Sequence, residues 1–296
     1  MKTSTPSIHP QTKIGAVALT IGNLERSLAF YQANLGFQLH RRAENIAHLG
    51  AGGPDLLLLH EQPGAPRPGP RSTGLYHFAI LVPSRRHLAQ SLRQLAANRT
   101  PLQGFADHLV SEAIYLADPD GIGIEIYRDR PRHEWPYEQG KLQMATDPLD
   151  LDGLLAEAPP ATAPRPGLDP ATTIGHVHLR VSHLPETEQF YRDLLGLELV
   201  TRYGAMASFF AAGGYHHHIG TNTWAGVGAP PPPAGAIGLR WYSLDLPDEA
   251  SLAQLRRRLE EAGIPITPTA DGLYLRDPAG NGIIVRSTKN TRLVTK

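Results

Sequence analysis

Several of the 14 histidines lie in segments that resemble strands rather than loops. His77 lies in YHFAILV, His176 and His178 lie in GHVHLRV, and a run of three histidines occupies 216–218 in YHHHIG. On a strand, residues two apart share a face and direct neighbours do not, so the run cannot converge on one point. Imidazole binds transition metals and exchanges protons near neutral pH. A histidine on such a strand is, taken alone, more often a core residue than a ligand.

Glu125 is the carboxylate with the most unusual surroundings, because it lies between Ile124 and Ile126 in a strand-like segment. An unpaired carboxylate that faces a core is costly. A metal ion would relieve that cost, and so would a salt bridge.

The composition excludes several classes of function. Lys plus Arg and Asp plus Glu both number 28, so no global field recruits nucleic acid or an anionic membrane. Cysteine is absent, which excludes disulfides, thiolate metal sites and cysteine nucleophiles. The start MKTSTPSIHPQTK lacks the apolar core of a signal peptide, and no run approaches the ~20 apolar residues of a spanning helix. We therefore expect a cytoplasmic protein.

Internal repeats define the elements that must position these residues. IGAVALTIGNLERSLAFYQANLGFQL begins at Ile14, and IGHVHLRVSHLPETEQFYRDLLGLEL begins at Ile174. A looser pair begins at Gly74 and Ala236, and each member is followed by a strand, an Asp-Pro turn and a final strand. The sequence thus predicts four βαβββ units in an α+β fold.

The units fall into two modules. We expect an N-terminal module over 10–132 with units 1 and 2, and a C-terminal module over 171–288 with units 3 and 4. Residues 133–170 contain LDLDGLLAEA, which predicts a short helix, and the Pro-rich APPATAPRPGLDP, which is typical of a semi-rigid linker.

Four such units resemble the vicinal-oxygen-chelate superfamily, in which paired units form a cupped sheet around a metal. The superfamily includes extradiol dioxygenases, glyoxalase I, resistance proteins and metal-free binding proteins, so the fold alone does not choose a function. Further motifs, TGLYHFAILVP, VSEAIYLADPDGIGIEIY and GGYHHHIGTNTWAG, resemble the Bacillus-type catechol-2,3-dioxygenase subgroup.

The resemblance implies that metal ligands lie on the first and last strands of a unit. Unit 2 offers His77 and Glu125 there, and unit 3 offers His176, with His178 as the alternative. Units 1 and 4 offer no ligand on their first strands, and no histidine follows His218. We therefore predict that unit 2 pairs with unit 3 and unit 1 with unit 4, giving two cupped mixed-sheet barrels, although pairing in order is common in two-domain extradiol enzymes.

The predicted set of His77, Glu125 and His176 has two imidazoles and one carboxylate, which suits non-haem Fe(II) and O2 chemistry. Mn(II) would fit the same ligands. The resemblance also implies that His217 is the acid–base residue, with His216 and His218 as alternatives. His108 and Tyr115 would hydrogen-bond the substrate.

We therefore expect an extradiol dioxygenase that cleaves a catechol or a simple substituted catechol with O2 and yields a 2-hydroxymuconic semialdehyde type of product. The rivals are a glyoxalase-I-like isomerase or thiol transferase and a metal-free binding protein of the same fold. Phe78, Phe105, Met206, Phe209 and Trp224 are the expected apolar lining of the pocket. Ring substituents, the position of cleavage relative to the diol and association into a homo-oligomer stay open.

Overall fold

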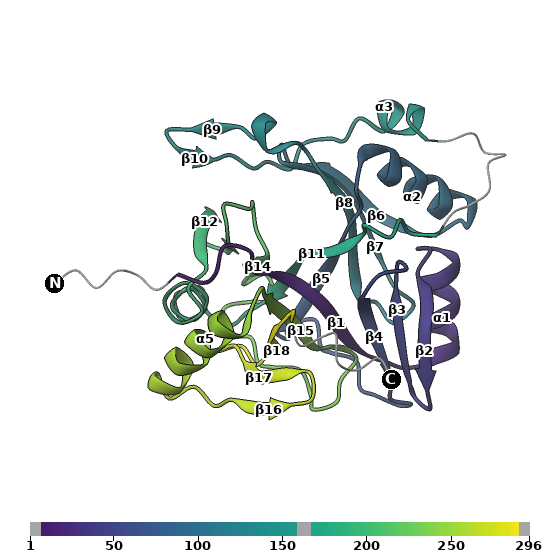
Figure 1. Cartoon of the computed structure of the whole chain (residues 1–296). Coiled ribbons are helices and arrows are strands. Elements are labelled where there is room, and N and C mark those ends of the chain that lie inside the picture. Colours follow the sequence, from purple (N-terminus) through teal and green to yellow (C-terminus); the bar gives the residue numbers. More distant parts are fainter. Residues whose placement is uncertain (1–6, 159–166, 290–296) are drawn as a thin grey trace.

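Two eight-stranded mixed sheets, with helices on their outer sides, make up the protein (Figure 1). The computed structural model describes residues 7–158 and 167–289. The α+β class and the four successive βαβββ units are confirmed.

The two units of the first half have the same order of elements. Unit 1 comprises β1 (Lys13–Ile21), α1 (Leu24–Ala33), β2 (Gln38–Ala43), β3 (Ile46–Gly50) and β4 (Asp55–Glu61). Unit 2 comprises β5 (Gly74–Leu81), α2 (Arg85–Ala97), β6 (Leu102–Asp107), β7 (Ser111–Ala117) and β8 (Gly123–Asp129).

The second half repeats this order, with a π-helical turn in unit 3. Unit 3 comprises β11 (Thr173–Arg180), α4 (Leu184–Glu188), the π-helical η2 (Gln189–Leu194), β12 (Glu198–Tyr203), β13 (Ala207–Ala211) and β14 (Ile219–Asn222). Unit 4 comprises β15 (Gly238–Leu246), α5 (Glu249–Glu261), β16 (Thr267–Thr269), β17 (Gly272–Arg276) and β18 (Gly282–Ser287).

The units pair across the two halves of the chain. One sheet has the strand order β16-β17-β18-β15-β1-β4-β3-β2, and the other has the order β12-β13-β14-β11-β5-β8-β7-β6. Units 4 and 1 therefore share the first sheet, and units 3 and 2 share the second, so the predicted crossed pairing is confirmed. The antiparallel pairs β1–β15 and β5–β11 join the units. The boundaries at 10–132 and 171–288 stay a prediction about how the chain divides.

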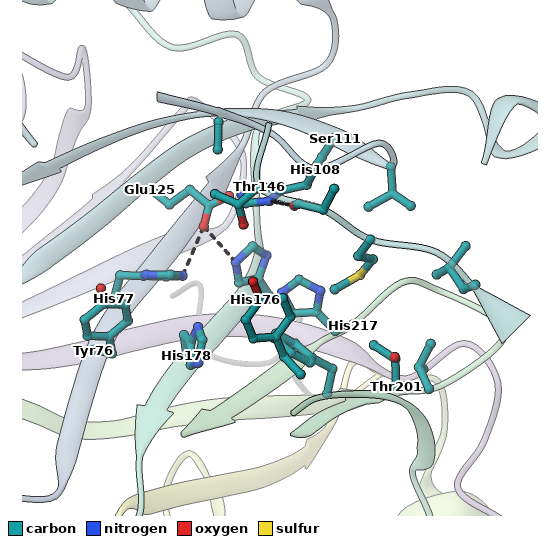
Figure 2. Close-up of a pocket in the computed structure, with 18 of the residues that line it drawn as sticks. Tyr76, His77, His108, Ser111, Glu125, Thr146, His176, His178, Thr201 and His217 are labelled. Carbon is teal, nitrogen blue, oxygen red and sulfur yellow. Dashed lines mark hydrogen bonds and ion pairs between the residues drawn. The ribbon is translucent and has the colours of Figure 1, made fainter. Parts of the chain in front are cut away.

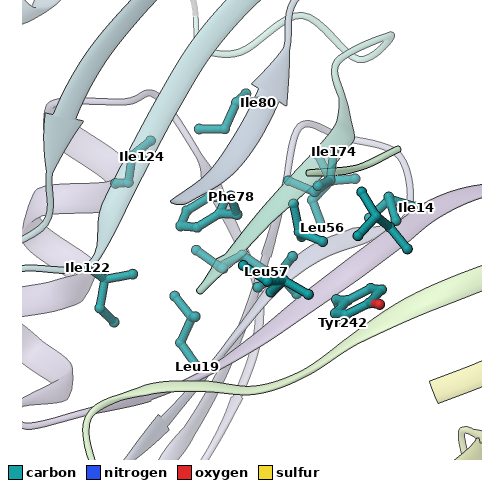
Figure 3. Close-up of a cluster of buried hydrophobic side chains, with 14 of the residues drawn as sticks. Ile14, Leu19, Leu56, Leu57, Phe78, Ile80, Ile122, Ile124, Ile174 and Tyr242 are labelled. Carbon is teal, nitrogen blue, oxygen red and sulfur yellow. The ribbon is translucent and has the colours of Figure 1, made fainter. Parts of the chain in front are cut away.

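Alternation along the strands separates a shared core from the cup that faces away from it. In β8, Ile124 and Ile126 join the core while Glu125 points to the opposite face. Figure 3 shows that side chains of both sheets, among them Phe78, Ile174 and Tyr242, meet in one buried cluster. Because this core fixes which face of each strand is buried, it also fixes the register of the polar residues on the other face.

Repeated tyrosines and Asp-Pro turns form a pair of matching links between units. Tyr31 of α1 donates to Asp118 Oδ2 over 3.0 Å, and Tyr191 of η2 donates to Asp277 Oδ2 over 3.0 Å. The other oxygen of each aspartate accepts two backbone N–H groups of its turn. These contacts connect unit 1 to unit 2 and unit 3 to unit 4, although the members of each pair lie in different sheets.

Residues between the two halves of the chain form short elements. These elements are η1 (Arg132–Glu134), β9 (Tyr137–Glu138), β10 (Lys141–Leu142) and α3 (Leu151–Ala156). The short helix predicted in this region is confirmed as α3. Most of the predicted Pro-rich linker, 159–166, lies outside the described residues. No helix in the described ranges is long and apolar enough to cross a membrane.

Candidate active site

His77, Glu125 and His176 meet on the concave face of the sheet that units 2 and 3 share (Figure 2). Glu125 on β8 and His176 on β11 both lie opposite Ala79, which belongs to the intervening strand β5. His77 is two residues from Ala79 and thus on the same face. The small Ala79 side chain leaves space between the three larger ones, so the register of three adjacent strands brings the three predicted ligands together.

The geometry of these three side chains fits a bound metal ion. Their ligand atoms all lie within 4.8 Å of one another, and each residue is at most 6% exposed. Glu125 Oε2 lies 3.0 Å from His77 Nε2 and 3.1 Å from His176 Nε2. Neighbouring ligands of an octahedral ion at ~2.1 Å are about 3.0 Å apart.

The orientation of His77 also fits a metal ion shared with Glu125. Its Nε2 is close to Glu125, but the pair lacks hydrogen-bond geometry, and the buried Nε2 has no other partner among the described residues. Two ligands of one ion direct their nitrogen and oxygen at a common point rather than at each other, so a short distance with poor alignment is what a shared metal ion requires.

The charge states around Glu125 also suit metal binding, which needs neutral imidazoles and an ionised carboxylate. Burial lowers the pKa of His176 to about 4, so its ring is neutral at pH 7. Burial opposes ionisation of Glu125, but the adjacent His176 and His77 rings outweigh it and hold the pKa of Glu125 well below its usual value.

His178 shares the face of His176 and neighbours His77, but its ring nitrogens do not converge with the three candidate ligands. The cluster of ligand atoms includes His176 and does not include His178. The His178 ring lies 5.1 Å from that of His77 between centroids and packs against Tyr76, Phe209 and Trp224, and its buried Nε2 has no hydrogen-bond partner among the described residues.

A cavity of about 1440 Å³ opens over the three side chains. Phe105, Phe209 and Trp224 line it as expected, whereas Phe78 belongs to the buried core and Met206 is exposed outside the cavity, so two of the five expected lining residues were wrong. Phe78 alternates with His77 on β5 and thus faces the other side of the sheet. The cavity also carries cationic side chains that the sequence analysis did not place there: Lys141, Arg180 and Arg202.

His108 and Tyr115 lie at one wall of the cavity and contact each other. Tyr115 is opposite Glu125 in the β7–β8 pair. Its hydroxyl lies 2.6 Å from His108 Nε2, and His108 Nδ1 lies 2.6 Å from the carbonyl of Ala145. A carbonyl only accepts, so Nδ1 carries a hydrogen and a neutral His108 accepts from Tyr115 through Nε2. Burial, together with the charge of Glu125, raises the pKa of Tyr115 well above its usual value.

Residues 143–147, here called the strap, position His108 from outside its own unit. Asp147 and Asp107 exchange two backbone hydrogen bonds of 2.9 Å, and Ala145 accepts from His108. Gln143, Met144, Ala145 and Thr146 line the cavity. The sequence analysis missed the strap, because these residues lack strand alternation and lie in a segment with the composition of a connection.

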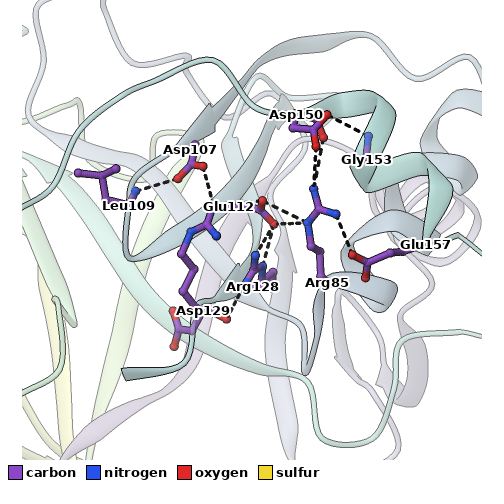
Figure 4. Close-up of polar contacts among 10 residues, drawn as sticks. Arg85, Asp107, Leu109, Glu112, Arg128, Asp129, Asp150, Gly153 and Glu157 are labelled. Carbon is purple, nitrogen blue, oxygen red and sulfur yellow. Dashed lines mark hydrogen bonds and ion pairs between the residues drawn. The ribbon is translucent and has the colours of Figure 1, made fainter. Parts of the chain in front are cut away.

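A buried carboxylate braces the loop that carries His108 (Figure 4). Glu112 is 3% exposed and accepts from Arg85, Arg128 and Arg130. Arg130 also pairs with Asp107 over 2.5 Å. Asp107 in turn accepts from the backbone N–H of Leu109, whose φ of 68° lies in the left-handed region. The network thus holds a strained turn next to His108.

Among the three consecutive histidines, His217 is the one that lines the cavity. Its ring lies 4.2 Å from that of His176 and 5.0 Å from that of Phe209, measured between centroids. Burial holds its pKa well below the usual value. His216 points away toward Asp129, and His218 Nδ1 accepts from the backbone of Ala212, so neither alternative faces the cavity.

Comparisons with known proteins agree with this architecture. The model of the Glyoxalase/Bleomycin resistance protein/Dioxygenase superfamily matches residues 13–126 and 173–285. The catechol-2,3-dioxygenase of Bacillus subtilis (strain 168) is 45% identical over 282 residues, which cover 94% of this chain and 98% of the relative.

Two solved structures share the fold at low identity. A crystal structure from Bacillus subtilis subsp. subtilis str. 168 has a TM-score of 0.63 at 15% identity, and the match covers 96% of this chain and 86% of the chain in that structure. Glyoxalase I from Zea mays has a TM-score of 0.58 at 17% identity, covering 95% and 94%. With the matches to the family model and to the B. subtilis relative, this chain belongs to the Glyoxalase/Bleomycin resistance protein/Dioxygenase superfamily.

Proposed function

We propose that this chain is an extradiol dioxygenase that opens the ring of catechol or a simple substituted catechol, using one Fe(II) and O2. The observation that carries the proposal is the buried set of two imidazoles and one carboxylate at His77, Glu125 and His176. This set leaves coordination positions open and is typical of non-haem Fe(II) oxygenases. The name of the near-full-length B. subtilis relative supports the same class of enzyme.

His77, Glu125 and His176 would hold the Fe(II), which would supply a common binding site for the diol and O2 and a route for electrons from ring to oxygen. Mn(II) fits the same ligands, so the identity of the metal is part of the proposal. The expected product is a 2-hydroxymuconic semialdehyde type of compound.

The protein's own groups would handle the protons and hold the substrate. His217 is neutral at pH 7 and lines the cavity above His176, so it can accept a proton from a diol hydroxyl and later return it. Tyr115 and His108, hydrogen-bonded to each other, would orient a substrate oxygen from the opposite wall.

The direct test starts from metal-free protein under anaerobic conditions. Fe(II) is added, then catechol, then air, and the yellow ring-opened semialdehyde is followed by absorbance. Colour that needs both Fe(II) and O2 would support the proposal, and parallel samples with Mn(II) would decide the metal. Bound iron without any colour from catechol or its substituted forms would favour an isomerase, and a failure to bind either metal would favour a binding protein.

His77→Ala is the matched variant for this assay. It removes one ligand without placing a new charge in the site, so it should lose bound iron and product formation while the circular dichroism spectrum stays that of the wild type. Full turnover with iron still bound would contradict the ligand assignment.

A further inference from the structure

A chain of hydrogen bonds runs from Asp129 to His217 behind the wall of the cavity. His216 Nε2 lies 2.8 Å from Asp129 Oδ1, and His216 Nδ1 lies 2.8 Å from His217 Nδ1. His216 is fully buried, stacked between Tyr215 and Trp135. The two histidines are sequence neighbours, but only His217 reaches the cavity.

Asp129 is itself held in place by two tyrosines. Tyr215 donates to its carboxylate over 3.0 Å, so the Tyr127 hydroxyl, 2.8 Å from that of Tyr215, must donate to Tyr215. The carboxylate thus receives hydrogen bonds from Tyr215 and His216 and keeps one orientation. Asp129 is the last residue of β8, four positions beyond Glu125, so the strand that supplies the carboxylate ligand also supplies this acceptor.

The carboxylate of Asp129 determines which ring nitrogens of His216 and His217 carry a hydrogen. A carboxylate only accepts, so a neutral His216 places its hydrogen on Nε2 and leaves Nδ1 as an acceptor. His217 must then carry its hydrogen on Nδ1, and its Nε2 keeps a free lone pair. The two nitrogens of an imidazole are coupled in this way, because the hydrogen bond made by one decides the state of the other.

We propose that Asp129 and His216 are positioning residues that fix His217 in the Nδ1–H tautomer and so leave Nε2 unprotonated on the cavity side. This inference rests on the proposed function in one respect, the role of His217 as acceptor of a diol proton. Asp129 and His216 touch neither substrate nor metal. They act as a carboxylate does behind a catalytic histidine, by selecting tautomer and orientation.

The opposite arrangement is chemically distinct. A His216 protonated on both nitrogens would donate through Nδ1, which would force His217 to accept through Nδ1 and carry its hydrogen on Nε2. That tautomer presents a donor to the cavity and cannot take a proton from the substrate.

The tautomers can be read directly by long-range ¹⁵N–¹H correlation spectra of the full-length, metal-free protein labelled with ¹⁵N-histidine. The wild type should show His217 as Nδ1–H and His216 as Nε2–H. This readout needs no metal and no turnover, so it stands even if the protein is not a dioxygenase. A His217 that is Nε2–H in the wild type would overturn the inference without any variant having to fold.

Two substitutions at 216 separate positioning from packing. His216→Gln keeps an acceptor toward His217 and a donor toward Asp129, whereas His216→Phe keeps an aromatic ring and loses both. We expect His216→Gln to preserve the Nδ1–H signal of His217 and His216→Phe to replace it partly or wholly by Nε2–H.

In the iron-loaded enzyme, His216→Phe should lower kcat about 10- to 100-fold, with iron content and KM little changed, and His216→Gln should restore most of the loss. His218→Phe is the matched control, because His218 makes no hydrogen bond to His217 among the described residues, and it should leave the His217 tautomer unchanged. An unaltered tautomer in His216→Phe, or equal loss of kcat in the Gln and Phe variants, would overturn the inference.

Discussion

Glu125 Oε2 and His176 Nε2 lie 3.1 Å apart although β5 separates their strands and 51 positions separate them in sequence. This contact exists because unit 2 shares a sheet with unit 3. Had the units paired in order, Glu125 and His176 would belong to different sheets. The candidate metal site therefore depends on the crossed pairing of the units. The first strands of units 1 and 4, which carry no candidate ligand, are neighbours in the other sheet.

The two histidines of β11 should differ sharply in their effect on metal binding. His176→Ala removes a member of the converging group and should abolish stoichiometric iron. His178→Ala should retain iron, because the His178 ring packs against Tyr76 and Trp224 and its nitrogens lie outside the group. Iron per chain after anaerobic reconstitution measures both variants. Loss of iron in His178→Ala with retention in His176→Ala would reverse the assignment.

Tyr115 and Tyr274 occupy equivalent positions in units 2 and 4, but only Tyr115 lies beside a candidate metal ligand. Tyr115→Phe removes the hydroxyl that contacts His108 and should lower kcat/KM about 10- to 100-fold with iron retained, the loss expected for one hydrogen bond to a charged substrate oxygen. Tyr274→Phe is the control, because Tyr274 lies opposite Ile284, where Tyr115 lies opposite Glu125. Steady-state kinetics of both variants test the difference. Equal loss of activity would indicate that the hydroxyl acts through the stability of the fold.

Much of the fold could be predicted because it repeats. The segments that begin at Ile14 and Ile174 share an alternating strand pattern, a helix pattern and a Leu-Gly pair at the end of the helix. These shared patterns identify the units without any knowledge of contacts. The pairing of the units was predictable only from the candidate metal ligands. Two histidines and a carboxylate that come from units 2 and 3 can bind one metal only if these two units share a sheet. The role of Tyr31 was not visible, because its partner Asp118 belongs to another unit and another sheet.

The site was less predictable than the fold for a physical reason. The resemblance to the superfamily identifies His77, Glu125 and Tyr115, because they occupy the positions that its motif gives to the ligands and to the tyrosine ten residues before the glutamate. His217 precedes β14 rather than lying in it, so strand alternation does not determine which of the three histidines faces inward. The strap contacts His108 through the backbone carbonyl of Ala145. Every residue type has such a carbonyl, so the sequence does not indicate this contact.

Asp118 should make stability fall as pH rises. Burial is the main cause that raises its pKa from 3.8 to about 6, against the hydrogen bonds from Ile122, Tyr31 and Asp120. Between these pH values the folded state holds a proton that the unfolded state has released, so this group's contribution is fully present below pH 3.8 and is lost as pH rises through about 6.

Asp118→Asn removes that titration. Relative to the wild type, the variant should gain about 2 kcal/mol in the free energy of unfolding between pH 4.5 and 7, at about 1.4 kcal/mol per unit of pKa difference. Urea unfolding at several pH values measures the gain, and the value below pH 3.8, where Asp118 is protonated in both states, gives the cost of the altered hydrogen bonds to Tyr31 and the turn. A difference between variant and wild type that stays constant with pH would contradict the prediction.

Glu112 should matter to both stability and catalysis, because three guanidinium groups converge on one buried carboxylate. Glu112→Gln keeps the shape and removes the charge, which leaves Arg85, Arg128 and Arg130 without their common counter-ion. Removing one partner of a buried ion pair costs about 3–5 kcal/mol, and urea unfolding should show a loss of that size. The exposed Arg256–Glu260 pair provides the control, since Glu260→Gln should cost under ~0.5 kcal/mol.

The same variant tests whether this network positions His108. Arg130 is shared between Glu112 and Asp107, and Asp107 caps the left-handed turn at Leu109. Release of Arg130 should therefore loosen the turn at Leu109 and lower kcat. Iron should stay bound, because His77, Glu125 and His176 lie on strands and not in this turn. If kcat per bound iron equals that of the wild type at a temperature where the variant is fully folded, the network serves stability alone, and the strap by itself suffices to hold His108.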